Sequence, residues 1–160
     1  MEKLNIICID DQRDVLAAVQ KDLVFFDPVC DIIECESTEE AEEVLEELYS
    51  GEKPVALIIC DHIMPGENGV DFLARLQQDD RFSSIASILL TGLATHHDTI
   101  EAINRAHISH YVEKPWKTDE FQKKIKILLT QFVIRSGRDF KDYIDFMDQS
   151  TLYKEMHGRS

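Results

Sequence analysis

The feature that most constrains the fold is a fivefold alternation between short apolar runs and segments with helical periodicity. The apolar runs, interpreted as strands, cover residues 4–9, 29–35, 55–60, 85–90 and 108–112. The helical segments between and after them cover residues 15–23, 38–48, 70–77, 95–106 and 118–134. Nearly unbroken apolar runs of this length are typical of strands buried on both faces of a parallel sheet. The pattern therefore predicts an α/β fold, with one parallel sheet of five strands and helices on both faces.

Composition limits the classes of function. A chain of 160 residues with 44% apolar side chains can bury the core of one domain. The formal net charge is −14, and all of the acidic excess lies in residues 1–130. Such an acidic body repels phosphates, so we expect no direct binding to nucleic acid or to an anionic membrane.

The cysteines and the N-terminus bear on localisation. Four cysteines occur without CxxC spacing, three within apolar runs and one at the end of a run. They are expected to be buried free thiols in a reducing compartment. No apolar run has the length of a membrane span, and the first residues lack a signal-peptide pattern. We therefore expect a cytoplasmic protein with no membrane association.

Polar side chains of particular types follow four of the five expected strands. Asp10 and Asp11 follow the first strand, Asp61 the third, Thr91 the fourth and Lys114 the fifth. Parallel sheets of this kind bind ligands at the carboxyl ends of their strands. We expect all five side chains to converge on one edge of the sheet.

This set of side chains suits phosphoryl chemistry. The carboxylates of Asp10, Asp11 and Asp61 would repel one another unless a cation neutralised them, and Mg²⁺ prefers such oxygen ligands. Lys114 and Thr91 add an ammonium group and a hydroxyl donor that can share the charge of a phosphoryl group. One carboxylate can itself be the nucleophile, and Asp61, alone at its strand end, is the best candidate.

The same residues carry a family resemblance. The chain resembles the receiver domains of two-component response regulators over about residues 3–130, and the matching pieces occur in the family's order. They are Ile9-Asp10-Asp11, Asp61-His62-Ile63-Met64-Pro65-Gly66-Glu67-Asn68-Gly69, Leu90-Thr91-Gly92 and Tyr111-Val112-Glu113-Lys114-Pro115. Each piece alone is weakly specific, whereas the ordered set is highly specific.

The resemblance implies a role for each site residue. Asp61 would be the phosphoacceptor, and Lys114 would clamp the phosphoryl group. Asp10, Asp11, Asp61 and the backbone carbonyl of Ile63 would surround Mg²⁺. The resemblance also implies that Thr91 and Tyr111 are a switch pair and that a cis peptide joins Lys114 to Pro115.

The resemblance further implies a flavodoxin-like sheet with strand order 2-1-3-4-5, in a receiver domain over residues 1–130. A histidine kinase or a phosphotransfer protein would supply the phosphoryl group. The chain would act as a signalling switch that catalyses its own phosphorylation and dephosphorylation, and not as an enzyme that turns over a free metabolite.

Residues 131–160 form a C-terminal extension of a different character. It holds five aromatic residues, and Phe140, Tyr143, Ile144 and Met147 follow helical spacing. A helical extension is expected, either folded back on its own domain or forming a contact with a second copy of the chain or with an output partner. The segment could also be the start of an output domain outside this chain, but it is too short for a DNA-binding helix-turn-helix.

Three other classes remain open at this stage. A Mg²⁺-dependent phosphohydrolase with an aspartyl-phosphate usually needs a second acid two residues after the nucleophile, where this chain has Ile63. A flavin-binding electron carrier needs a phosphate-binding loop after the first strand, and the acidic stretch 10–14 would repel phosphate. A receiver-like module that only binds partners would not need a complete site.

Overall fold

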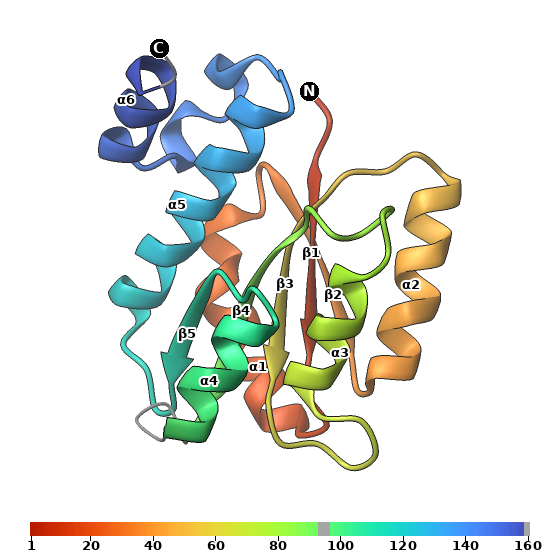
Figure 1. The fold of residues 1–160 in the computed structure, drawn as a ribbon. Coiled ribbons are helices and arrows are strands. Elements are labelled where there is room, and N and C mark those ends of the chain that lie inside the picture. The colour runs from red at the N-terminus through yellow and green to blue at the C-terminus, as the bar shows by residue number, and fades with distance from the viewer. Residues whose placement is uncertain (93–96, 159–160) are drawn as a thin grey trace.

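The computed structural model describes residues 1–92 and 97–158, and Figure 1 shows the arrangement of its elements. The strands are β1 (Leu4–Ile9), β2 (Cys30–Cys35), β3 (Val55–Asp61), β4 (Ala86–Thr91) and β5 (His110–Glu113). The α-helices are α1 (Arg13–Leu23), α2 (Thr38–Ser50), α3 (Gly69–Gln77), α4 (His97–Arg105), α5 (Thr118–Arg135) and α6 (Gln149–His157). Short 3-10 turns are η1 (Val24–Phe26), η2 (Phe140–Asp142) and η3 (Ile144–Phe146).

The five strands form one parallel sheet in the order β2-β1-β3-β4-β5. One apolar core lies between the sheet and the helices α1 and α5, and the other lies between the sheet and α2, α3 and α4 (Figure 1). All six residues of β1 are buried, as expected for a central strand covered on both faces. The fold class and the strand order expected from the sequence are confirmed.

Within residues 1–130 the described elements start and stop close to the expected positions, with one clear difference. The fifth strand was expected from residue 108, but β5 begins at His110. His107 has a positive φ of 53°, and the N–H of Ile108 still donates to Ile103 in α4, so the chain joins the sheet only after this turn. The expected start of the preceding helix, at residues 95–96, lies outside the described residues.

The C-terminal extension does not continue as one regular helix. Gly137, with a φ of 76°, ends α5, and the N–H of Arg138 bonds back to Val133. The segment expected to carry a helical stripe forms the two turns η2 and η3, because the backbone at Tyr143 (φ −116°, ψ 0°) leaves the helical region between them. The α-helix of the extension, α6, begins only after Asp148, which caps it.

The extension is packed against its own domain. Tyr143, Met147 and Leu152 are buried in the same apolar core as α1 and α5. The Tyr143 hydroxyl donates to the backbone oxygen of Glu2 (2.7 Å), and the Phe146 ring lies 5.4 Å from that of Phe25. Of the arrangements left open by the sequence, the folded-back one is therefore present, and the buried aromatic side chains are not available to a second copy.

All four cysteines, Cys8, Cys30, Cys35 and Cys60, are free and buried, as expected. Among the described residues, no helix has both the length and the apolar character needed to cross a bilayer. Figure 1 places the N-terminus and helix α6 beyond the amino ends of the strands, at the end of the molecule opposite the expected site.

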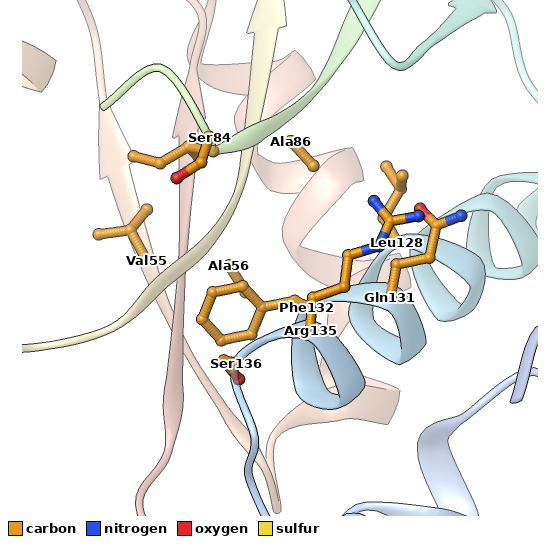
Figure 2. A pocket seen from close by; sticks show the side chains of 10 residues that line it. Val55, Ala56, Ser84, Ala86, Leu128, Gln131, Phe132, Arg135 and Ser136 are labelled. Carbon is orange, nitrogen blue, oxygen red and sulfur yellow. The ribbon is translucent and has the colours of Figure 1, made fainter. Parts of the chain in front are cut away.

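A cavity of about 470 Å³ lies between the amino ends of β3 and β4 and the last turns of α5. Figure 2 shows Val55, Ala86 and Phe132 among the side chains around it. Ligands of parallel sheets bind at the carboxyl ends of the strands, and this cavity lies at the amino ends. The position of the candidate site therefore follows from the strand ends and not from this cavity.

Candidate functional site

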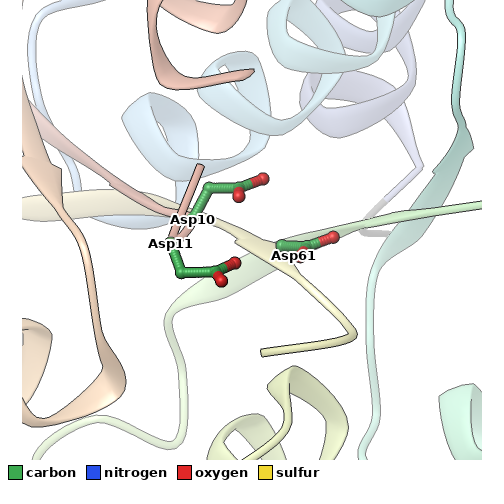
Figure 3. Close-up of side chains that lie close together, drawn as sticks. All are labelled: Asp10, Asp11 and Asp61. Carbon is green, nitrogen blue, oxygen red and sulfur yellow. The ribbon is translucent and has the colours of Figure 1, made fainter. Parts of the chain in front are cut away.

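The parallel topology brings the three expected carboxylates together. Asp10 follows β1, Asp11 follows Asp10, and Asp61 is the last residue of the adjacent strand β3. One carboxylate oxygen from each lies within 4.8 Å of the others, and Figure 3 shows the three side chains pointing to the same side. Asp10 and Asp61 are buried, whereas Asp11 is exposed. The cluster is thus shielded from solvent at Asp10 and Asp61 and open to solvent at Asp11.

Lys114, the residue directly after β5, contacts the cluster with its ammonium group. Its Nζ lies 2.7 Å from Asp61 Oδ1 and 3.4 Å from Asp10 Oδ2. The backbone N–H of Lys114 donates to the carbonyl of Thr91, which ties the end of β5 to the end of β4. The peptide between Lys114 and Pro115 is cis, in agreement with the resemblance. The bond to Thr91 therefore fixes the backbone of Lys114 at the edge of the sheet on one side.

The electrostatics of the cluster favour a cation. Burial raises the pKa of Asp10, and the nearby charge of Asp61 adds to this, although the N–H of Gln12 donating to Asp10 opposes it. Burial alone would lower the pKa of Lys114, but its hydrogen bond and attraction to Asp61 outweigh burial and raise it. One ammonium group cannot balance three carboxylates. The donor set, three carboxylates with one open corner, fits a hard divalent ion such as Mg²⁺ that keeps several waters.

The remaining expected residues lie around this cluster in different environments. Thr91, at the end of β4, is buried, while Tyr111 in β5 is 43% exposed. The Lys124 ammonium donates to the backbone oxygen of Tyr111 (3.0 Å) and lies over its ring. The Ile63 side chain is 63% exposed, so it does not fill the site. The structure brings Asp10, Asp11, Asp61 and Lys114 together, whereas the Tyr111 ring turns outward.

The loop between β3 and α3 depends on a glycine whose role the sequence analysis did not assign. The N–H of Gly69 donates to His62, and the side chain of Asn68 caps α3 by accepting from Asp71. A Cβ on Gly69 would overlap the backbone carbonyl oxygen of Asp61. Its position in a turn-rich segment after the nucleophile candidate is a signal that could have suggested this close approach.

We expect Gly69→Ala to destabilise the protein by about 1–3 kcal/mol, because the added methyl group must push the loop away from Asp61. Thermal unfolding measures the loss. Gly92→Ala is the matched control, since a Cβ at Gly92 meets no atom within 4 Å among the described residues. Equal melting temperatures for the two variants would contradict the close approach.

Comparisons with known proteins agree with this geometry. The family model described as "Response regulator receiver domain" matches residues 6–126. The hydrogenase transcriptional regulatory protein HoxA of Cupriavidus necator is 30% identical over 118 residues, which cover 74% of this chain but 22% of HoxA. The chemotaxis protein CheY1 of Helicobacter pylori is 28% identical over 99 residues, or 62% of this chain and 76% of CheY1.

Solved structures show the same fold. The signal receiver domain of an HD domain-containing protein from Pseudomonas fluorescens Pf-5 superposes with a TM-score of 0.72 at 25% identity, covering 87% of this chain and 96% of that one. The chain spans about a fifth of the length of HoxA, so what the whole of that relative does is not carried over from the match.

Proposed function

The chain belongs to the response regulator receiver domain family, and from this premise we propose that Asp61 accepts a phosphoryl group in a Mg²⁺-dependent reaction. Receiver domains are signalling switches rather than enzymes that turn over a metabolite. The observation that carries the assignment of Asp61 is its position: its carboxylate lies 2.7 Å from Lys114 Nζ and shares a cluster with Asp10 and Asp11.

The proposed step is a single phosphoryl transfer. A carboxylate oxygen of Asp61 attacks the phosphorus atom, a new oxygen–phosphorus bond forms, and the bond from phosphorus to the donor breaks. The electron pair of the broken bond leaves with the donor, which is a phosphohistidine of a kinase or of a phosphotransfer protein. Lys114 is placed to hold one phosphoryl oxygen by its ammonium group. Because the Asp61 carboxylate is buried in the fold, this nucleophile is already in position before the donor binds.

Asp10, Asp11, Asp61 and the backbone carbonyl of Ile63 are the residues that would hold Mg²⁺. When bound, the ion supplies positive charge to the phosphoryl oxygens and allows them to approach the carboxylates. Asp10 is held in place for this by the N–H of Gln12, which donates to its Oδ1 (2.9 Å). The exposed Asp11 leaves room for the ion and its waters to enter.

Thr91 and Tyr111 are proposed as the switch pair. A phosphoryl group on Asp61 attracts the Thr91 hydroxyl, and the outward Tyr111 ring can then turn toward the space that Thr91 leaves. The surface of α4, β5 and α5 changes as a result. The charge added at Asp61 thereby alters side-chain packing on a surface away from the site. The exposed Tyr111 ring is consistent with the unphosphorylated arrangement of such a switch.

The remaining assignments are also proposals. Residues 1–130 form the phosphoacceptor unit, and residues 131–160 form an extension that stabilises it through Tyr143, Met147 and Leu152. The partners are a histidine kinase or phosphotransfer protein and a downstream output protein or domain, with a second copy of the chain as a further candidate. The compartment is the cytoplasm, where such kinases present their phosphohistidines.

The phosphohydrolase alternative is set aside, because position 63 carries an exposed isoleucine instead of an acid.

Intact mass measurement after incubation with Mg²⁺ and a small phosphodonor tests the function. One added phosphoryl mass that is lost on treatment with hydroxylamine, which cleaves acyl phosphates, is the expected result. A chain that stays unmodified at saturating donor and Mg²⁺ would contradict the proposal.

Mg²⁺ is expected to stabilise the protein, because binding relieves repulsion among the three carboxylates in the native state. At a hundredfold excess over the dissociation constant, mass action contributes about 2.7 kcal/mol, which corresponds to a rise in melting temperature of roughly 5–10 °C for a chain of this size. Asp11→Asn and Asp61→Asn should each weaken the effect, whereas Asp14→Asn, exposed on α1 and outside the cluster, should retain it. An unchanged wild-type melting temperature at saturating Mg²⁺ would contradict the metal site.

A further inference from the structure

The loop that carries Lys114 into the site has little packing of its own. Between β5 and α5, Pro115 and Lys117 are exposed and Trp116 is half-buried, and Thr118, the first residue of α5, is also exposed. The loop borders an open hollow of about 550 Å³, whose other wall is formed by side chains of α1. Burial therefore fixes this loop only in part, although the position of Lys114 Nζ depends on it.

A buried carboxylate on α1 binds the loop. Asp22 accepts a hydrogen bond at each carboxylate oxygen, from the Trp116 indole N–H at Oδ2 (2.7 Å) and from the Thr118 hydroxyl at Oδ1 (2.9 Å). Its backbone oxygen accepts a third, from the Gln122 amide (2.8 Å). Asp22 itself is only 7% exposed, although it borders the open hollow together with Trp116 and Thr118. Hydrogen bonds to an ionised acceptor are about twice as strong as neutral ones.

Neither bond is needed to form or to pack the fifth helix. Thr118 is the first residue of α5, after an N-cap at Lys117 that makes no side-chain bond. The Trp116 ring packs 5.4 Å from that of Phe121. Its indole N–H donates to Asp22 in addition, a contact that packing alone does not require.

The backbone of Lys114 thus lies between two fixed points. On one side, its own N–H bonds to Thr91 at the end of β4. On the other side, Trp116, two residues later, is bound to α1 through Asp22. We propose that Asp22 is a positioning residue for phosphoryl transfer: by fixing Trp116 and Thr118 it holds Lys114 Nζ against Asp61. The inference rests on the proposed function, because it assigns Asp22 a role through the phosphate clamp.

The first test reads the position of Lys114 without any phosphoryl chemistry. Trace acylation of the full chain with acetic anhydride, followed by peptide mass spectrometry, gives the relative reactivity of each lysine. An amine held in an ion pair with Asp61 reacts slowly, because its lone pair is not available. In Asp22→Asn we expect Lys114 to become several-fold more reactive relative to the other lysines, and Trp116→Phe and Thr118→Val to show the same change to a smaller degree.

Asp27→Asn is the matched control, since Asp27 is an exposed acid shortly after α1 with the same change of charge. It should leave the pattern of lysine reactivity unchanged. Unchanged Lys114 reactivity in Asp22→Asn overturns the inference. A uniform rise over all lysines also overturns it, because that outcome marks a loss of the fold and not of the position of one side chain. If Asp22→Asn does not fold, the two single-donor variants decide by the same criteria.

The second test follows phosphorylation at saturating Mg²⁺. We expect Asp22→Asn to be slower by about ten- to a hundredfold, the cost of misplacing a catalytic group by about 1 Å, with Mg²⁺ affinity unchanged. A wild type that takes no phosphoryl group refutes the proposed function, while the acylation pattern still decides whether Asp22 positions Lys114. A phosphorylated wild type with an equally fast Asp22→Asn refutes the inference alone.

Discussion

Replacing Asp61 by asparagine is expected to abolish phosphorylation of the chain while leaving it folded. The amide has nearly the same shape as the carboxylate but lacks a nucleophilic anionic oxygen, so the attack on phosphorus cannot occur. The fold should survive because the substitution removes one charge from a cluster of like charges, which offsets the loss of the ion pair with Lys114. Intact mass after incubation with Mg²⁺ and a small phosphodonor measures the effect, and circular dichroism checks the fold.

Asp119→Asn is a suitable control, since Asp119 is exposed in the first turn of α5, outside the carboxylate cluster. It should be phosphorylated like the wild type. An Asp61→Asn protein that still gained one phosphoryl mass in full yield would assign the acceptor to another residue and contradict the site.

Tyr143→Ala is expected to have the largest effect on stability, a loss of about 3–5 kcal/mol, as for the truncation of a buried aromatic side chain. The ring is 4% exposed within the core shared with α1 and α5, and its hydroxyl binds the backbone oxygen of Glu2. For a chain of this size the melting temperature should fall by roughly 10 °C or more.

Tyr153→Ala makes the same chemical change on the exposed side of α6, where the side chain is 67% exposed. It should cost less than about 1 kcal/mol. Tyr143→Phe should lie between the two, near 1 kcal/mol, because it removes only the hydroxyl that binds Glu2. If both alanine variants melted at the wild-type temperature, the extension would not be part of the folded unit.

The sheet could be predicted from the sequence because its central strands are buried on both faces. In β1 every residue is buried, and the run over Leu4–Ile9, which is apolar except for Asn5, indicates this from the sequence alone. The convergence of Asp10, Asp61 and Lys114 then follows from parallel topology alone, without knowledge of any side-chain contact. These parts of the prediction depend only on local apolar patterns and on the rule that the carboxyl ends of parallel strands lie at the same edge of the sheet.

The extension could not be predicted in the same way. Tyr143 is buried by contacts with Glu2 and with the core on α1, more than a hundred residues away in sequence. Its spacing from Phe140 and Met147 fits a regular helix, whereas long-range packing and the cap at Asp139 select 3-10 turns. Periodicity thus indicated which residues face the core, but it did not predict the backbone conformation of the segment.

Asp22 was missed for a related reason. An acidic residue in a predicted surface helix is usually solvated, and nothing adjacent to it in sequence suggests a partner. The available signal is its position three residues after the buried Val19 and next to the buried Leu23, on the side of α1 that faces the core. A charged residue at such a position needs hydrogen-bond partners, and Trp116 and Thr118 supply them from the segment that follows β5, almost a hundred residues later in the sequence.

The burial of the four cysteines has a consequence for measuring how the protein opens. Burial raises the pKa of Cys30 and of Cys35 to about 12, and it raises the pKa of Cys8 and Cys60 as well. In the native state these sulfurs are therefore neither ionised near neutral pH nor accessible, so an alkylating reagent can modify them only during excursions that uncover them. Cys8 lies on the side of the sheet that faces α1 and α5, and Cys60 on the side that faces α2, α3 and α4. The rates at which these two thiols are alkylated would then tell whether the two layers separate from the sheet together or one before the other.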